Sequence, residues 1–454
     1  MELLQEMLEK NEEQLEIIQK ILTWTPEELH EEIEDIHPVD LLEELEHYEG
    51  EKKDILNRLP DYYIALMIGE LEDEDKYELL SLFSKVREEK IISEMASDDL
   101  ADLLGELEDS VQKEIIAKMD WEQAEEVKEL LTYEDDTAGG LMATEFIAIQ
   151  EGMTVKETID YLRKEAPSSE TPYYIYVLDE REVLKGVVSL RDIIVSDDEI
   201  VIGDIMSENI LSVPVDMDQE EVGRLFEKYG YMVIPVVDED NVMCGIITFD
   251  DIIGVLNEET TEDIYLLGGL SEGEEIDSSP LDAIKSRLPW LLVNLVTAAM
   301  AASVVGLFEG TISKIVALAT FMPIVTGMGG NAGTQTLTLI VRGIALDELN
   351  DKNTKKILIK ELVVGVVNGL CLGIIIGIVA QLWVGKAIFG FVIGTAMVLN
   401  LIVAASAGYF VPVILKKFNV DPALASGVFV TTFTDIMGFF FFLGLATVFV
   451  EQLI

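Results

Sequence analysis

The sequence predicts a multidomain membrane protein with an all-α superhelical N-terminal domain, an α/β tandem repeat, a connecting amphipathic helix and a five-helix α transmembrane domain. Three observations predict this order. Acidic residues are concentrated in the first 288 residues, one sequence pattern recurs at an offset of 59 residues, and long uncharged stretches fill the C-terminal part. We place the domains at 1–135, 136–257, 258–285 and 286–454.

The charge of the chain is divided unevenly. Of 454 residues, 31 are Lys or Arg and 86 are Asp or Glu, which gives a net charge of −55. Residues 289–454 hold 9 of the basic and 8 of the acidic residues, so the whole excess lies in the first part. Such a surface repels nucleic acid and attracts cations. We therefore expect a cation as partner and no nucleic acid, with an ordinary solvated acidic surface as the plainer alternative.

Residues 1–135 have a helical pattern throughout. An apolar-acidic phrase recurs as DLLEEL, ALMIGEL and DLLGEL, with turn-forming residues between the copies. This pattern predicts short helices stacked in a superhelix. Asp98 and Asp102 lie four residues apart on one helix face, where like charges destabilise a helix unless something binds between them. We treat them as candidate cation ligands, with a solvated face as the alternative.

The tandem repeat occupies residues 136–257. Aligning YVLDEREVLKGVVSLRDII with PVVDEDNVMCGIITFDDII pairs Asp192 with Asp251, each three residues after a Ser or Thr. Each copy predicts the order strand, helix, strand, strand, helix. The repeat resembles a tandem pair of CBS domains, which share a Gly, two apolar residues, Ser or Thr, and then Asp. The resemblance implies that ATP or another adenine nucleotide binds through Asp192 and Asp251, and a simple helix cap is the alternative.

Residues 258–285 connect the repeat to the apolar region. Glu258, Glu259, Glu262 and Asp263 cluster at the start of an expected amphipathic helix. A helix at this position could transmit a movement of the cytoplasmic domains to the transmembrane domain. The alternative is an ordinary charged linker.

Five long stretches contain no charged residue apart from one Asp in the last. They have 21 to 29 residues each, and about 20 helical residues cross a bilayer core of about 30 Å. Lys and Arg gather before the first stretch, in 342–361 and between the last two, which places these connections in the cytoplasm. We expect a multi-pass inner-membrane protein with cytoplasmic N-terminal domains and its C-terminus outside. The stretches are Leu288–Phe308, Ile315–Val341, Leu362–Gly385, Ala387–Leu415 and Pro422–Val450.

The second stretch begins IVALATFMPIVTGMGGNAGTQT and contains Pro323 and several glycines. We expect a broken helix, because breaks at membrane depth are tolerated where the backbone faces protein or a water-filled cavity. We expect the neutral polar side chains of Asn331, Thr334 and Gln335 to line a pore, where they can bind water. Close helix packing through the small residues is the alternative.

Asp435 is the one acid of the fifth stretch, within TTFTDIMG. We expect it about 20 Å along that helix, near the bilayer midplane. The stretches contain no Lys, Arg or His to pair with it, and such acids usually face an interior pathway. If Asp435 is ionised, a permeating cation would neutralise its charge. The alternative is a protonated Asp with a structural role. In a symmetric dimer, two such carboxylates suit a largely hydrated Mg²⁺.

The whole chain resembles the MgtE family of magnesium channels and transporters, with PIVTGMGGNAGTQTLTL and TTFTDIMG as the most specific segments. The resemblance implies a homodimer in the lipid bilayer, a pore lined by the second and fifth spans with Asp435 as the selective acid, and closure of the pore by intracellular Mg²⁺. Acids are frequent in the family at Gly230 and Gly254, which implies that one sensor site is missing and the sensor is tuned differently here. An Asn occurs in the family at Gly427, which implies a different pore mouth. The implied sensor ligands are Asp98, Asp102, Asp218, Glu220, Asp251, Glu259, Glu262 and Asp263, with Glu258 beside them.

The predicted function is Mg²⁺ uptake through a selective channel that intracellular Mg²⁺ closes. Two alternatives stay open: a coupled secondary transporter that exports or exchanges divalent cations, and a nucleotide sensor that uses the spans as an anchor. We do not expect an enzyme, because no Ser/His/Asp or Cys/His pairing and no GxxxxGK phosphate loop is apparent.

Overall fold

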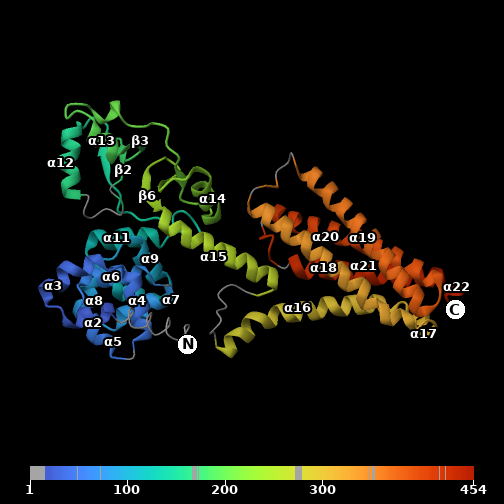
Figure 1. Ribbon diagram of the computed structural model, residues 1–454. Helices are drawn as coiled ribbons and strands as arrows, with labels where there is room; N and C mark the ends of the chain where they lie inside the picture. The colour runs from blue at the N-terminus through green and yellow to red at the C-terminus, as the bar shows by residue number, and fades with distance from the viewer. Residues whose placement is uncertain are drawn as a thin grey trace. The chain divides into compact units, whose positions relative to one another are not determined.

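The computed structural model describes residues 16–48, 50–71, 73–165, 171, 173–270, 279–346, 348–349, 353–418, 420–424 and 426–454 (Figure 1). The chain divides into two compact units, with the boundary between Leu256 and Asn257. Each unit is described separately below.

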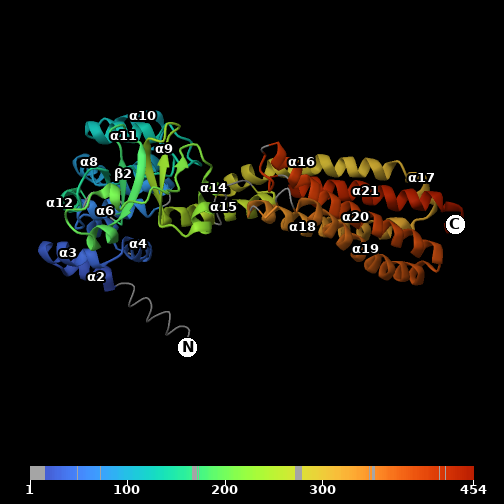
Figure 2. The ribbon, with the colours of Figure 1, turned by 90° about the horizontal axis from the view of Figure 1, so that it is seen from above.

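Short helices form the first part of the N-terminal unit (Figures 1 and 2). Their apolar residues meet in one buried cluster that includes Ile64, Leu80 and Leu104. The prediction of a helical N-terminal domain is confirmed. The helices are α2 (Glu16–Thr23), α3 (Pro26–Glu32), α4 (Pro38–His47), α5 (Lys52–Leu56), α6 (Asp61–Gly69), α7 (Asp73–Ser81), α8 (Lys85–Ile92), α9 (Ser97–Gly105), α10 (Asp109–Ile116) and α11 (Trp121–Leu130).

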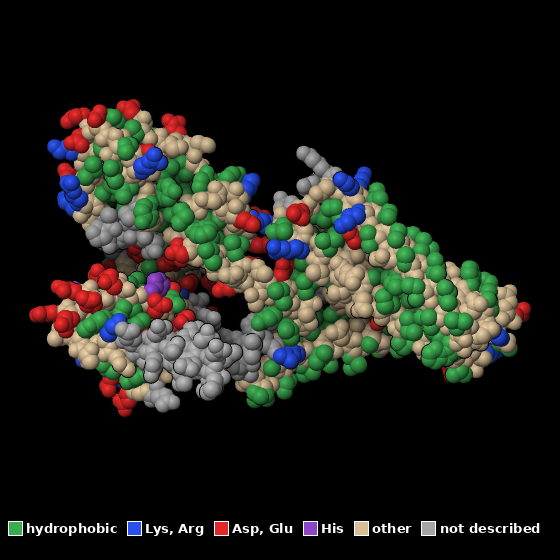
Figure 3. Space-filling view, in the orientation of Figure 1, with side chains coloured by type: hydrophobic (Ala, Val, Ile, Leu, Met, Phe, Trp, Pro, Cys, Tyr) green, Lys and Arg blue, Asp and Glu red, His purple; other side chains and the backbone are tan. Residues whose placement is uncertain are grey.

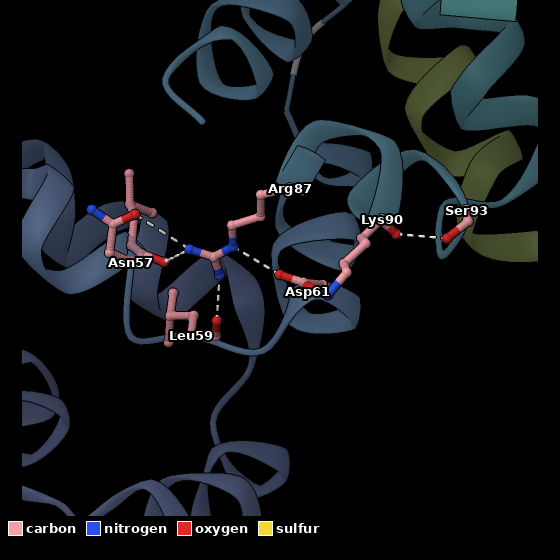
Figure 4. Close-up of polar contacts among 7 residues, drawn as sticks. Asn57, Leu59, Asp61, Arg87, Lys90 and Ser93 are labelled. Carbon is pink, nitrogen blue, oxygen red and sulfur yellow. Dashed lines mark hydrogen bonds and ion pairs between the residues drawn. The ribbon is translucent and has the colours of Figure 1, made fainter. Parts of the chain in front are cut away.

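Arg87 of α8 braces the connection between α5 and α6 (Figure 4). Its guanidinium donates hydrogen bonds to Asp61 Oδ1 (2.7 Å), Leu59 O (2.5 Å) and Leu56 O (3.2 Å). Carbonyl groups at the end of a helix lack partners within that helix, and the forked guanidinium can satisfy two of them at once. The stacking of these short helices therefore depends on a polar brace as well as on the apolar core.

Two similar three-stranded sheets follow, with strand orders β1-β2-β3 and β4-β5-β6. In both, the first two strands are parallel and the last two are antiparallel. The predicted order of strand, helix, strand, strand, helix is confirmed in both copies. The elements are β1 (Ala148–Gln150), α12 (Val155–Glu165), β2 (Tyr174–Leu178), β3 (Leu184–Ser189), α13 (Leu190–Val195), β4 (Val213–Pro214), α14 (Gln219–Tyr229), β5 (Val233–Val237), β6 (Met243–Thr248) and α15 (Phe249–Gly268).

The two copies are joined through their hairpin turns. Glu182 and Asn241 hold matching positions, with φ angles of 61° and 63°. The N–H of Met243 donates to Glu182 O and the N–H of Leu184 donates to Asn241 O, both over 3.0 Å. One apolar cluster takes residues from both copies, so the copies share a core. Its buried members are Ala143, Tyr176, Leu178, Leu184, Val237, Met243 and Ile246.

Long helices form the C-terminal unit, and hydrophobic side chains cover much of their visible surface (Figure 3). Within the described residues, four are long and apolar enough to cross a membrane: α16 (Pro280–Gly306), α19 (Thr354–Val384), α20 (Ala387–Lys417) and the 427–448 part of α21 (Ser426–Val448). The long helix α18 (Ala317–Ala345) packs with α20 and α21 and is not among these four. The count of five spans therefore stays a prediction. Two short helices, α17 (Glu309–Lys314) and α22 (Val450–Leu453), complete the unit.

The predicted break in the second span is wrong, because α18 is one continuous helix despite Pro323. Proline removes a single hydrogen bond, and packing against neighbouring helices can compensate for it. The glycines have a different role: Gly329 lies against Asn400 of α20, and Gly333 lies against Val430 of α21. For these two glycines the close-packing alternative is therefore confirmed.

The predicted connecting helix does not begin as a helix of its own at residue 258. The acidic residues from Glu258 onward continue α15, which begins at Phe249 as the last helix of the second copy. Residues 271–278 of the predicted connecting segment lie outside the described residues, and α16 begins at Pro280.

Candidate functional site

One face of α18 carries neutral polar side chains. Asn331, Thr334 and Gln335 are exposed in the single chain, and their spacing places them along one side of the helix. The other side is buried through residues such as Gly329 and Gly333. Helix α18 therefore has one packed face and one polar face.

Asp435 lies on α21 and is half-buried. Because α21 begins at Ser426 rather than at the predicted Pro422, Asp435 lies about 14 Å along the helix instead of about 20 Å. The preceding residue, Thr434, is fully buried, and its methyl group would lie 3.5 Å from a Cβ at Gly333 of α18. Asp435 is therefore at the edge of the contact between α21 and α18, next to the helix that bears the polar face.

Asn400 of α20 was not singled out by the sequence analysis. Its side chain is 0% exposed, and its Nδ2 donates to Val325 O of α18 over 2.9 Å. It also packs against Gly329 of α18 and Gly438 of α21, while its Oδ1 has no hydrogen-bond partner among the described residues. Asn400 therefore ties three helices together behind the polar face of α18. The sequence did not point to Asn400, because a single Asn in an apolar stretch matches no recognisable motif.

Glu361 is a second acid that sequence reasoning missed. It is 4% exposed near the start of α19, accepts a hydrogen bond from Thr336 of α18 (3.3 Å), and lies 3.1 Å from Lys360 Nζ. The predicted third span began at Leu362, which assigned Glu361 to a loop. The helix starts earlier, at Thr354, and this acid links α18 to α19.

The predicted acids of α9 lie beside a lysine. Asp98 accepts a hydrogen bond from the N–H of Asp99 (2.9 Å). Lys76 Nζ of α7 lies 3.2 Å from Asp102 Oδ2 and 3.5 Å from Asp99 Oδ1. An ammonium group therefore lies among the carboxylates of α9. Lys76 and Asp99 were missed, although a lone Lys within DEDKYELL was a visible signal.

The final Asp of each copy accepts a hydrogen bond from the Ser or Thr at the start of its own helix. Ser189 donates to Asp192 Oδ2 (2.6 Å), and the Thr248 hydroxyl donates to Asp251. Both contacts match the capping alternative. The residue Asp251 is exposed as a whole, but its carboxyl group is surrounded by protein, and this burial raises its pKa. The hydrogen bond from Thr248 and the charge of Lys76 lower the same pKa by smaller amounts.

The remaining predicted sensor residues lie on α14 and α15. Asp218 caps α14 by accepting from the N–H of Glu220 (2.9 Å), and Glu220 pairs with Arg224 (2.6 Å). On α15, Glu258 is exposed, and its three acidic neighbours are half-buried: Glu259, Glu262 and Asp263. In the described parts of this single chain, no three Asp, Glu, His or Cys side chains form a group that could hold a metal ion.

Helix α9 also joins the short helices to the repeat. The N–H and hydroxyl of Ser97 donate to the two oxygens of Glu145 over 3.0 and 2.7 Å. Ala101 of α9 lies in one apolar cluster with Ile252 and Val255 of α15. The two parts of the N-terminal unit therefore meet through a polar and an apolar contact.

The far end of α15 contacts the helices that bear the polar face and Asp435. Leu266 is 6% exposed and packs in one cluster with Leu337 of α18 and Val430 of α21. A Cβ at Gly427 would lie 3.4 Å from Leu267 O. A movement of this end of α15 would therefore act directly on α18 and α21.

Three family models match the chain. The model described as "Divalent cation transporter" matches residues 322–445, the MgtE intracellular N domain matches 36–136, and the CBS domain matches 138–198 and 202–258. These matches confirm the tandem CBS resemblance.

Curated relatives extend over most of the chain. The magnesium transporter MgtE of Thermus thermophilus is 38% identical over 433 residues, which cover 93% of this chain and 95% of that protein. The MgtE of Bacillus subtilis is 36% identical over 390 residues, which cover 86% of each. A crystal structure of the soluble part of a magnesium transporter is 35% identical, with a TM-score of 0.51, and the match covers 55% of this chain and 99% of that one. The chain belongs to the MgtE family of magnesium transporters.

Proposed function

We propose that the protein is a Mg²⁺-selective channel for magnesium uptake, in which Mg²⁺ passes along the polar face of α18 beside Asp435. The observation that carries this proposal is an acid in an otherwise uncharged helix, next to a helix that leaves Asn331, Thr334 and Gln335 exposed. Mg²⁺ prefers oxygen ligands and loses its water reluctantly. A carboxylate with amide and hydroxyl groups nearby suits an ion that keeps most of its water.

In this proposal the channel is a homodimer. A single chain offers one Asp435 and leaves the polar face of α18 exposed, which is unfavourable in lipid. A twofold axis beside α18 would cover that face and bring a second carboxylate to the pathway. The topology we propose places the N-terminal domains in the cytoplasm and the C-terminus outside.

The proposed gate is controlled by intracellular Mg²⁺. The large negative charge of the N-terminal residues favours their separation, and ions that fit only a compact arrangement shift the population towards it. Moving a two-state equilibrium from 1:99 to 99:1 requires about 5.5 kcal/mol, which several weak sites can supply together. Helix α15 is suited to carry the change, since it begins in the second CBS copy and its end packs on α18 and α21. The proposed ligands are Asp98, Asp102, Asp218, Glu220, Asp251, Glu258, Glu259, Glu262 and Asp263.

Nucleotide binding is a subsidiary proposal. ATP would use the carboxylates of Asp192 and Asp251, where its ribose hydroxyls would compete with Ser189 and Thr248. Calorimetry of ATP against the full-length protein and its Asp192→Asn and Asp251→Asn variants tests this. Equal heats for all three proteins would contradict it.

The coupled transporter is the alternative. Broken helices at membrane depth are compatible with a channel and with a coupled transporter, so the continuity of α18 does not distinguish the two. Flux into liposomes that follows the Mg²⁺ gradient alone, without dependence on Na⁺ or protons, would exclude obligatory coupling.

The experiment that tests the pathway is Mg²⁺ flux into liposomes by the full-length protein and its Asp435→Asn variant. We expect the variant to lose at least about tenfold in flux, because the amide removes the only charge that the α21 helix offers to the ion. Glu451→Gln is the matched control, since Glu451 is an exposed acid of α22. Equal flux in wild type and Asp435→Asn would overturn the pathway.

A further inference from the structure

A buried ammonium group lies against the acidic helix α9. Lys76 of α7 is 3% exposed as a whole residue, and its Nζ lies within 3.5 Å of both Asp99 and Asp102. Lysine is almost never this buried unless it is paired, because an unpaired charge is strongly disfavoured away from water. The carboxylates of α9 therefore account for the burial of Lys76, and Lys76 in turn reduces the repulsion among them.

A glycine at the end of α6 allows the carboxylate of Asp99 to lie close to Lys76. Helix α7 packs against α6, α8 and α9. At the end of α6, a Cβ on Gly69 would collide with the carboxylate of Asp99. The absence of a side chain at Gly69 lets Asp99 lie against α6 with its carboxylate within reach of Lys76. Three helices thus contribute to the position of one ion-pair cluster.

The cluster also lies where the short helices meet the second CBS copy. The charge of Lys76 acts on Asp251, at the start of α15. Beside it, Ala101 of α9 is buried with Ile252 of α15. Lys76 therefore pairs with acids of a helix that packs against the start of α15.

We propose that Lys76 is a built-in cation that neutralises Asp99 and Asp102 of α9 and thereby favours the contact between α9 and α15. The inference rests on the proposed function, in which Mg²⁺ neutralises the acids of the sensor, Asp102 among them. A lysine is tethered to the chain, so its local concentration does not change with the ions in solution. The contact between α9 and α15 then has a Mg²⁺-independent component, which lowers the Mg²⁺ concentration that the sensor needs.

The test is Lys76→Met in the full-length protein, because methionine keeps an unbranched apolar stem and removes the charge. Hydrogen exchange of the α9 peptide is measured across a Mg²⁺ titration. We expect α9 to exchange faster without Mg²⁺ and to regain protection as Mg²⁺ takes the place of the ammonium. The Mg²⁺ concentration for half-protection should rise at least about fivefold, since removing one partner of a buried pair is strongly destabilising. Calorimetry should detect one additional Mg²⁺ per chain.

Three further variants separate the role of the charge from that of packing. Lys85→Met is the matched control, because Lys85 pairs with Glu114 and both side chains are exposed. Lys76→Arg keeps the charge and should keep protection without Mg²⁺. The double variant Lys76→Met with Asp102→Asn removes a charge of each sign and should restore most of the Mg²⁺-independent protection.

The proposal is overturned if Lys76→Met leaves the exchange curve and the Mg²⁺ stoichiometry unchanged. It is equally overturned if α9 loses protection that neither Mg²⁺ nor the double variant restores, because the role of Lys76 would then be purely structural. Mg²⁺ flux of the same preparations distinguishes this result from a failure of the proposed function. Wild-type protein that carries no Asp435-dependent flux would contradict the channel and leave the role of Lys76 in the contact unaffected.

Discussion

Ser97 and Glu145 form a two-point contact at the start of α9, in which the hydroxyl and the N–H of Ser97 both donate to one carboxylate (2.7 and 3.0 Å). Carboxylates stabilise helix N-termini because they pair with N–H groups that have no partner in the helix. Here the capping group comes from 48 residues further along the chain. The contact therefore holds a helix of the N-terminal domain against the CBS pair.

We expect Glu145→Ala to loosen this contact. Hydrogen bonds to a charged group contribute about 1.5–3 kcal/mol each, and Ser97 is only 1% exposed, so its groups would lose buried partners. Hydrogen exchange of the α9 peptide should accelerate while that of β5 stays constant. Glu180→Ala, at an exposed acid of the first hairpin turn, is the control and should change neither. Equal α9 exchange in both variants would show that Glu145 does not hold the contact.

Gly329→Ala should disturb the packing of α18 on α20. The added Cβ would collide with the side chain of Asn400, which is buried and cannot move freely. Overpacking of this kind costs about 1–3 kcal/mol. We expect a lower unfolding temperature in detergent and reduced Mg²⁺ flux. Gly327→Ala is the matched control on the same helix, since its Cβ position has nothing within 4 Å among the described residues apart from the adjoining backbone of α18. The idea fails if both variants unfold at the same temperature.

Leu266→Ala should weaken the connection between α15 and the pathway helices. Leu266 is buried against Leu337 and Val430, and truncation of a buried leucine typically costs 2–5 kcal/mol. We expect Mg²⁺ flux to persist and its inhibition by Mg²⁺ on the cytoplasmic side to require a higher concentration. Ile264→Ala removes a similar side chain that is exposed on the same helix, and should leave inhibition unchanged. An identical inhibition curve for Leu266→Ala would argue against α15 as the transmitting element.

Arg87→Lys should destabilise the N-terminal helices even though it preserves the charge. Lysine cannot reproduce the forked contacts with Asp61, Leu59 and Leu56. Loss of two hydrogen bonds from a charged group, at about 1.5–3 kcal/mol each, corresponds to about 3–6 kcal/mol of unfolding free energy. Urea unfolding followed by circular dichroism measures the change. Arg163→Lys is the control, because Arg163 makes an exposed pair with Asp160, and it should unfold like the wild type.

The repeat could be predicted because its pattern is local. Asp192 and Asp251 end matching phrases, and the strands before them are continuous apolar runs whose identity does not depend on distant partners. The apolar stretches were equally visible, since mean hydropathy requires no knowledge of packing. These features specify which elements form and in what order.

The side-chain contacts depend on distant residues and could not be predicted in the same way. Lys76 meets Asp102 across 26 residues, and Asn400 meets Val325 across 75, so no local pattern connects either pair. The glycines of α18 were interpreted as a break because their partners, on α20 and α21, were unknown. The start of α19 was misplaced because Glu361 is a charged residue that the helix buries.

The shared core of the two CBS copies determines how this region can evolve and fold. Tyr176 and Leu184 of the first copy are buried with Met243 and Ile246 of the second, so each half supplies the surface that the other needs. A chain cut after residue 200 would present an unfilled apolar surface to water. We therefore expect the duplicated region to unfold as a single cooperative unit, with a substitution in one half felt by its neighbours in the other.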